Sequence, residues 1–268
     1  TGVTITSIYD LLSENAFSLN GANHAVVDYR ESPAERYVNL VTEGDSLQVA
    51  IDSAAINDTI LVHDGTYTED LTISTEGLTL KSVNEHGATL QGDTLRLEAD
   101  DVTIDGFIID NLDGAQTAIA PTDSDGVTIQ NNIIRNSARG IQGDYYGTPT
   151  NLTVHNNIFE ATVLRGISNT EGMTNLVVTD NEIYSPATGI ALGTGITVTE
   201  ISGNTFNGSR AFTIYEPTID PATISGNTFD SASAYAGYEG IYIKDSTNSY
   251  DLAAIITNNT FTNAVYFN

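Results

Sequence analysis

Short segments in which apolar and polar residues alternate follow one another along most of the chain, and they recur as a longer unit. The stretch VTIQNNIIRNSARGIQGD at 127–144 shows this unit: an apolar segment, a polar pair ending in Asn, a second apolar segment and a Gly-Ile step. LTVHNNIFEATVLRGISN at 152–169 and LVVTDNEIYSPATGIALG at 176–193 repeat it. Short alternating segments rich in Ile, Val, Thr and Phe, broken by Asn, Gly and Asp, predict β-strands rather than helices.

The unit returns every 23 to 26 residues, and the insertion SASAYAGYEG lengthens the last step to 32 residues. The second residues of the polar pairs form the column Gly106, Asn132, Asn157, Asn181, Asn204, Asn227 and Asn259. Three short strands per period describe one coil of a parallel β-helix, in which coils stack about 4.8 Å apart. The pattern therefore predicts an all-β fold, a single-stranded parallel β-helix or solenoid.

This geometry also explains the six asparagines of the column. A tight turn between strands needs a residue that tolerates the left-handed region of backbone conformation, and Asn and Gly both do. Stacked in register, each Asn amide can bond to the next coil and satisfy buried backbone groups. We expect a structural asparagine ladder here, which carries no chemistry of its own.

The segment DSLQVAIDSAAINDTILVHDGTYTEDLTIS at 45–74 precedes the repeat. Asp45 or Ser46 can cap a short helix with Leu47 and Ile51 on one face, and DTILVHDGTYTEDLTI supplies the first strands. This arrangement, followed by repeated VTIxNNxI segments, resembles the right-handed parallel β-helix proteins of the pectate-lyase-like superfamily over residues 45–268. The resemblance implies a right-handed coil. It leaves function broad, because the superfamily includes polysaccharide lyases, hydrolases, epimerases, adhesins and surface-layer proteins.

Residues 1–44 lie outside the repeat, and we expect a helical or irregular arm that caps the first coil. Apolar residues there stand at helical spacing, namely Ile5, Ile8, Leu11 and Leu12. At the other end, Val265 and Phe267 fall within a coil, and no polar capping segment follows them. An uncovered coil exposes strand edges and core side chains. Either the natural chain continues, or subunits assemble head to tail through these apolar residues into filaments or a surface layer.

Composition narrows the partners. The chain has 35 Asp and Glu residues against 9 Lys and Arg, a formal net charge of −26. Such a charge repels nucleic acid, and no apolar run approaches the length of a membrane span. There is no Cys, so disulfides and zinc-thiolate sites are excluded. An acidic, lysine-poor chain of this kind suits a secreted or cell-surface protein.

The candidate chemistry lies in an arginine column before the Gly-Ile steps, Arg139, Arg165 and Arg210. The resemblance implies one use, since the lyases of the superfamily abstract a proton beside a sugar carboxylate with Arg or Lys while a cation neutralises the acid. Tyr146 and His155 follow in sequence and would join such a site. The alternative, which we favour, is that the arginines form surface ion pairs. The acidic residues available for these pairs are Asp144, Glu160, Glu171 and Glu216.

Acidic residues also gather where a cation could bind. Asp101, Asp105, Asp123 and Asp125 belong to the densest carboxylate region, and stacked turns could bring their oxygens around Ca²⁺. The segment is not an EF-hand, because the twelfth position after Asp123 is Ile134 rather than Glu. Solvated turn aspartates are the interpretation that we favour.

Two classes of function follow. The first, which we favour, is a structural or adhesive extracellular β-helix protein that self-assembles, with no enzyme activity and no certain cofactor. The second is a lyase or epimerase of acidic polysaccharides that uses the arginine column and a bound cation. An acidic polysaccharide is the partner in the second class and fits the adhesive version of the first.

Overall fold

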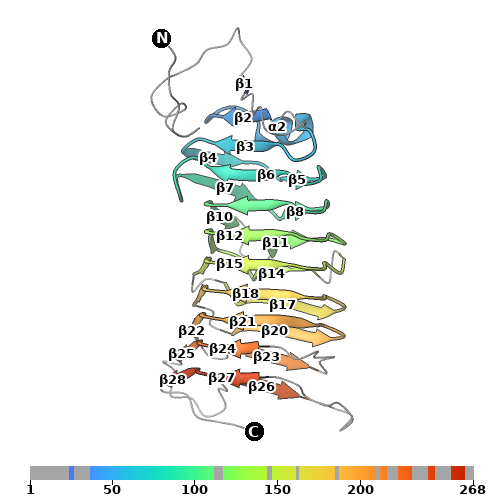
Figure 1. Ribbon diagram of the computed structural model, residues 1–268. Coiled ribbons are helices and arrows are strands. Elements are labelled where there is room, and N and C mark those ends of the chain that lie inside the picture. Colours follow the sequence, from blue (N-terminus) through green and yellow to red (C-terminus); the bar gives the residue numbers. More distant parts are fainter. Residues whose placement is uncertain are drawn as a thin grey trace, which may run out of the picture.

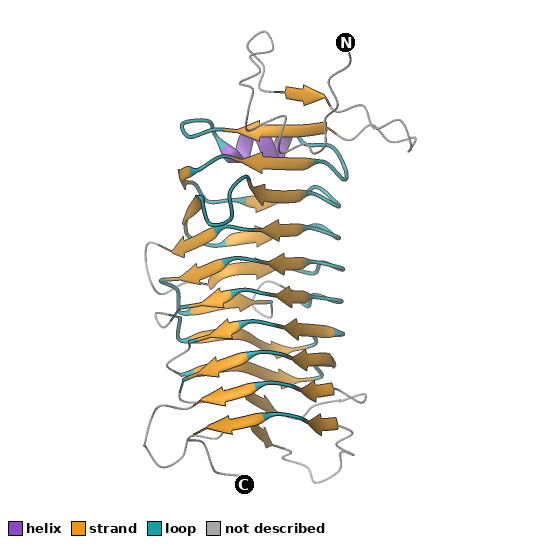
Figure 2. Cartoon of the chain, turned by 60° about the vertical axis from the view of Figure 1, so that its left-hand side comes forward, coloured by secondary structure: helices purple, strands orange, loops and turns teal. Residues whose placement is uncertain are grey.

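The chain forms a right-handed parallel β-helix, in agreement with the fold predicted from the repeat (Figure 1). The computed structural model describes residues 24–26, 37–111, 117–143, 147–160, 163–184, 187–208, 212–215, 223–230, 241–244 and 255–262. Each coil contributes one strand to each of three sheets, which we call A, B and C. Figure 2 shows the coils stacked one below the other along a single axis.

Sheet A begins with an antiparallel pair and continues with parallel strands only. Its strands, in spatial order, are β1 (His24–Val26), β2 (Tyr37–Val41), β3 (Thr59–Val62), β6 (Thr79–Ser82), β9 (Thr103–Asp105), β12 (Thr128–Gln130), β15 (Thr153–His155), β18 (Leu176–Thr179), β21 (Val198–Ser202), β24 (Thr223–Ser225) and β27 (Ile255–Thr257).

Sheets B and C are parallel throughout. Sheet B consists of β4 (Gly65–Thr68), β7 (Ala88–Gly92), β10 (Ile108–Asn111), β13 (Ile133–Arg135), β16 (Ile158–Phe159), β19 (Glu182–Ile183), β22 (Thr205–Asn207), β25 (Thr228–Asp230) and β28 (Thr260–Thr262). Sheet C consists of β5 (Thr72–Ile73), β8 (Leu95–Leu97), β11 (Thr117–Pro121), β14 (Arg139–Gln142), β17 (Arg165–Glu171), β20 (Thr188–Thr194), β23 (Phe212–Tyr215) and β26 (Ile241–Lys244).

The core is a set of apolar columns, because in-register pairing places equivalent side chains above one another. Sheet A contributes the buried column Ile60, Leu80, Ile104, Ile129, Val154, Val178, Ile201 and Ile224. In sheet B the column ends in aromatic residues. The rings of Phe206 and Phe229 stack with centroids 5.2 Å apart, and those of Phe229 and Phe261 with centroids 4.7 Å apart. Apolar burial along the whole solenoid is the main term that stabilises it.

The asparagines form a continuous hydrogen-bonded ladder at the A-to-B turn. The side-chain Oδ1 of Asn157 accepts the backbone N–H of Asn132 at 3.0 Å, and its Nδ2 donates to the carbonyl of Ile129 at 2.8 Å. The same pair of bonds recurs at the other ladder residues, Asn132, Asn181, Asn204, Asn227 and Asn259. The ladder thus satisfies backbone groups that the turn leaves buried.

One detail of the predicted turn was wrong. The residue before each ladder asparagine, not the ladder asparagine itself, adopts the left-handed backbone conformation. These positive-φ residues are Gly106, Asn131, Asn156, Asp180, Gly203, Gly226 and Asn258. Gly106 therefore belongs to this column, and Phe107 takes the ladder position, where its N–H donates to Asn132 Oδ1 at 2.9 Å. The two roles split because αL geometry suits an exposed Asn or Gly, while amide bonding needs a buried Asn.

Helix α2 (Leu47–Ser53) covers the first coil and buries Leu47 and Ile51. Ser46 is its N-cap, and the Glu69 carboxylate accepts the N–H groups of Leu47 and Gln48 at 2.8 and 3.2 Å. A carboxylate from the coil below therefore helps to hold the helix onto the solenoid. Within the described residues, no helix has the length and apolar character needed to cross a membrane.

Candidate functional site

The corner between sheets B and C is shaped by a column of glycines, Gly140, Gly166 and Gly189. A β-carbon on Gly140 would lie 2.6 Å from the Gly166 carbonyl oxygen and 2.6 Å from the Phe159 ring. A β-carbon on Gly166 would lie 2.6 Å from the Gly189 carbonyl oxygen. No side chain fits here, so the backbone passes close to the core and the preceding residue turns toward the surface.

The residues that precede the first two of these glycines are Arg139 and Arg165, which we call the arginine pair. They are in register on β14 and β17, between Thr117 on one side and Thr188 on the other. Neighbouring strands lie about 4.8 Å apart, so two guanidinium groups project from adjacent coils. Arg139 is half-buried and Arg165 is exposed.

The ion pairs expected for these arginines are absent from the described part of the solenoid. There, carboxylates pair with Lys81 and Arg135 rather than with the arginine pair. Glu160 and Glu171 are described and do not lie within ion-pair distance of either arginine. Asp144 and Glu216, the other two expected partners, lie outside the described residues, as does Arg210. The structure thus brings together two arginines that no described carboxylate neutralises.

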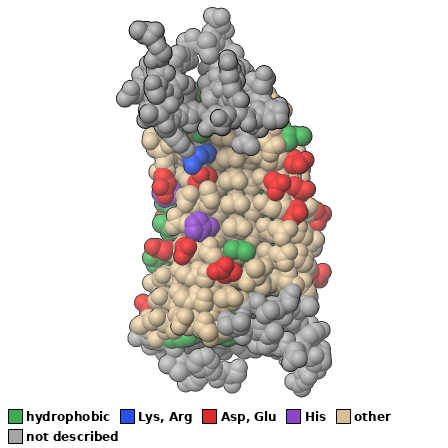
Figure 3. All heavy atoms as spheres, viewed as in Figure 1, with side chains coloured by type: hydrophobic (Ala, Val, Ile, Leu, Met, Phe, Trp, Pro, Cys, Tyr) green, Lys and Arg blue, Asp and Glu red, His purple; other side chains and the backbone are tan. Residues whose placement is uncertain are grey.

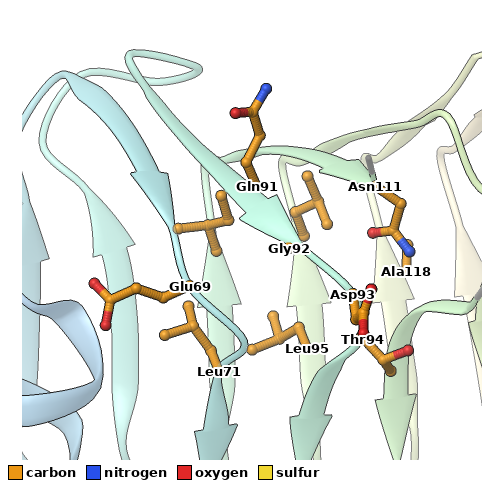
Figure 4. A pocket seen from close by; sticks show the side chains of 11 residues that line it. Glu69, Leu71, Gln91, Gly92, Asp93, Thr94, Leu95, Asn111 and Ala118 are labelled. Carbon is orange, nitrogen blue, oxygen red and sulfur yellow. The ribbon is translucent and has the colours of Figure 1, made fainter. Parts of the chain in front are cut away.

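A shallow hollow lies at the same corner, three coils above Arg165 (Figure 4). Leu71, Leu95 and Ile109 contribute its apolar lining, and Thr94 and Asn111 add polar groups. Asn111 is buried, and its Nδ2 donates to the carbonyl of Thr117, the residue in register with Arg139. The sequence gave no signal for this hollow, because its polar residues come from separate coils and share no motif.

The remaining candidates for a lyase site do not join the arginine pair. His155 ends β15 on sheet A, where its Nδ1 lies 2.9 Å from Thr179 Oγ1 and 3.6 Å from Asp180 Oδ2. The arginine pair belongs to sheet C, so the fold separates this imidazole from the two guanidinium groups. Tyr146 lies outside the described residues.

The four aspartates considered for calcium each serve a separate turn or strand. Asp101 has φ 56° and occupies a left-handed turn position. Asp123 accepts the Thr148 N–H, and Asp125 accepts from the Thr150 hydroxyl at 2.7 Å. Asp105 lies on β9 and binds Lys81. Among the described residues, no three His, Cys, Asp or Glu side chains form a group able to hold a metal ion.

Asp105 is the most strongly engaged of these carboxylates. Burial alone would raise its pKa, but hydrogen bonds from Lys81 and Asn131 outweigh that effect and hold the pKa below its usual range. A carboxylate engaged in this way locks two coils of sheet A together. We therefore assign Asp105 a structural role.

The acidic groups are not spread evenly over the surface. Figure 3 shows acidic side chains along both sides of the visible face and a mainly uncharged area between them. This distribution agrees with the position of the described aspartates at the turns between sheets.

The comparisons with known proteins agree on the repeat. A family model described as periplasmic copper-binding protein (NosD) matches residues 53–268. A search of curated proteins finds no significant match. Among solved structures, the PL6 family alginate lyase AlyGC is similar with a TM-score of 0.54 and 18% identity, over 84% of this chain and 39% of that one. The chain thus spans about two fifths of the length of this lyase.

Two further structures have the same coiled architecture. An alginate lyase from Paenibacillus sp. str. FPU-7 is 16% identical over 84% of this chain and 96% of that one, with a TM-score of 0.48. A pectin methylesterase in complex with a hexasaccharide is 15% identical over 83% of this chain and 86% of that one, with a TM-score of 0.43. At such identities the likeness concerns the fold alone.

Proposed function

Because this chain belongs to the family of NosD-type periplasmic copper-binding proteins, we propose that it works outside the cytoplasm, as an adhesive β-helix protein that binds acidic polysaccharide through the arginine pair. The observation that carries the proposal is the register of Arg139 and Arg165 on adjacent strands without a described carboxylate partner. In a chain with a net charge of −26, two such cations are an uncommon local feature.

The chemistry of guanidinium groups suits this ligand. Arginine forms two parallel hydrogen bonds to one carboxylate, and a polymer of uronic acids presents carboxylates at regular intervals. Two arginines on adjacent coils therefore offer contacts to one extended chain that runs along the solenoid. The hollow at the same corner adds apolar surface and the polar groups of Thr94 and Asn111.

The net negative charge does not prevent this binding at moderate salt. The screening length is about 8 Å at physiological ionic strength, so distant carboxylates act weakly on a ligand at the corner. The guanidinium groups act at contact distance, where screening is least effective. Binding without cleavage is favoured because the described residues place no His or carboxylate beside the arginine pair.

The experiment measures affinity for alginate and polygalacturonate by calorimetry, with neutral dextran as the control polymer. Arg139→Gln/Arg165→Gln should weaken binding by about tenfold or more, since each lost contact is charge-assisted. Arg139→Lys/Arg165→Lys should recover only part of the affinity, because lysine keeps the charge but not the planar fork. Arg135→Gln removes a charge from sheet B and should leave binding unchanged.

Two outcomes would overturn the proposal. One is equal affinity of the wild type and the Arg139→Gln/Arg165→Gln protein for the uronate polymers. The other is the appearance of the ultraviolet absorbance of an unsaturated sugar that disappears in Arg139→Ala, which would establish the lyase alternative.

Head-to-tail association remains a second proposal, and one observation supports it. Ile256 is 45% exposed, whereas Ile224, the preceding residue of the same core column, is 1% exposed. The core column therefore reaches the surface at β27, as an apolar contact for another subunit. The residues that the sequence marked for this contact, Ile5, Ile8, Leu11, Leu12, Val265 and Phe267, lie outside the described residues.

A further inference from the structure

The description of the family raises a question that the residues of this chain can answer, namely whether the solenoid holds copper. Proteins bind copper through thiolate, thioether and imidazole groups, usually several at once. This chain has no Cys, one Met and four His in its 268 residues. The complete supply of soft and nitrogen ligands is therefore five side chains, and copper binding depends on whether the fold brings them together.

The single thioether is not available. Met173 is 0% exposed and belongs to the hydrophobic core of the solenoid. Its sulfur is surrounded by apolar side chains, and coordination would require the core to open and a charged ion to enter it. Such a desolvation is costly when no other ligand accompanies the ion.

The imidazoles lie apart. His63 follows β3, His86 lies between β6 and β7, and His155 ends β15, so each belongs to a different coil. His86 Nε2 lies 2.9 Å from the carbonyl oxygen of Asn131, and His155 Nδ1 lies 2.9 Å from Thr179 Oγ1. These two rings already have hydrogen-bond partners that link neighbouring coils.

The fourth histidine does not complete a site by its backbone position. His24 on β1 is in register with Asn39, which is in register with Ile60. His63 lies three residues beyond Ile60 along the sheet, which corresponds to about 10 Å in an extended strand. Among the described residues, moreover, no three His, Cys, Asp or Glu side chains form a metal-binding group.

We infer that this member of the family does not build a copper site, and that its histidines act as hydrogen-bonding groups between coils. The repeat that defines the family is then a scaffold that does not by itself confer copper binding. The inference depends on the five ligand side chains alone. It is independent of the arginine pair, so it can fail while polysaccharide binding holds, and the reverse.

A direct test must separate specific binding from the attraction of a cation to 35 acidic residues. Cu(I) is offered to the full chain, without a histidine tag, in competition with bicinchoninate. The chelator should retain all of the Cu(I), because no thiolate or accessible thioether competes for it. Cu(II) is then titrated and followed by electron paramagnetic resonance. Its signal should show oxygen ligands without nitrogen coupling and should weaken as salt is added.

Variants make the test decisive. His155→Gln, His86→Gln and the nearly isosteric Met173→Leu should all behave like the wild type toward copper. The inference is wrong if one equivalent of copper is held with nitrogen coupling that a histidine substitution removes. It is equally wrong if Met173→Leu, while still folded by circular dichroism, releases Cu(I) that the wild type withholds from the chelator.

Discussion

At the residue scale, the asparagine ladder shows how one side-chain type can perform a task that no substitute performs. Each ladder amide accepts from one coil and donates to another, so a single residue satisfies buried backbone groups on two turns. Asp and Leu are close in size, but Asp lacks the amide donor and Leu lacks both functions. The exposed residue before it has a different task, since only its backbone conformation matters.

We expect Asn157→Ala to destabilise the protein by about 2 to 5 kcal/mol, because it leaves the Asn132 N–H and the Ile129 carbonyl buried without partners. Urea denaturation followed by circular dichroism measures the loss. Asn156→Gly is the matched control, because Gly retains the left-handed conformation of this residue, φ 51°, and the side chain is exposed. A loss of similar size in both variants would contradict the role of the ladder.

At the scale of the element, in-register pairing converts a short strand of three residues into part of a continuous sheet. Strands as short as β16 and β19 are stable only because equivalent residues above and below repeat their hydrogen bonds and apolar contacts. The same register lets charged side chains pair between coils, as Lys81 on β6 does with Asp105 on β9. Such pairs add to the coherence of a sheet whose individual strands are weak.

The Lys81–Asp105 pair predicts a dependence of stability on pH. The pKa of Asp105 is lower in the folded protein than in the unfolded chain, whose value is about 3.9. Its contribution is therefore complete above that value and is lost as the pH falls through the folded pKa. Asp105→Asn should cost about 1 kcal/mol near neutral pH, because the pair is only partly buried.

The measurement is the urea midpoint of the two proteins across the acid range. The curves of the wild type and Asp105→Asn should converge at low pH. Asp93→Asn, at an exposed carboxylate, should remain close to the wild type at neutral pH. A constant difference at every pH would show that Asp105 acts through packing and not through its charge.

Much of this architecture could be predicted from the sequence, because periodicity is a property of the whole chain. The coil, the ladder from Asn132 to Asn259 and the register of Arg139 with Arg165 all follow from counting residues. The partners of individual side chains do not. Whether Arg165 meets Glu171, or Asp105 meets Lys81, depends on rotamers and on the corner between sheets, which spacing along the chain does not encode. The shift between Gly106 and Phe107 was missed because Gly and Asn both tolerate the left-handed conformation, and only the register separates the two columns.

At the scale of the whole molecule, two properties oppose each other in solution. A net charge of −26 keeps molecules apart, while an apolar residue such as Ile256 favours contact. The repulsion acts over the screening length, about 30 Å at 0.01 M salt and about 10 Å at 0.1 M. The apolar contact acts only at short range and is little weakened by salt.

End-to-end association should therefore increase with salt and with protein concentration. Sedimentation velocity at several salt concentrations should show growing assemblies for the wild type and a monomer for Ile256→Ser. Leu164→Ser is the control, since Leu164 is 51% exposed but precedes β17 on the side of the solenoid. Monomers at all concentrations and salts, or equal effects of the two substitutions, would contradict association through β27.

The stacking of equivalent coils has a further consequence for how such a protein changes over generations. Leu152 and Leu176 occupy equivalent places in successive coils, because Thr153 is in register with Val177. Loss of residues 152–175 would join Asn151 to Leu176 and leave the cross-section intact, with Arg139 now beside Thr188 instead of Arg165. The molecule is in this sense a ruler with divisions of about 4.8 Å. Gain or loss of a division sets both its reach from the cell and the number of charged groups that a bound polymer meets.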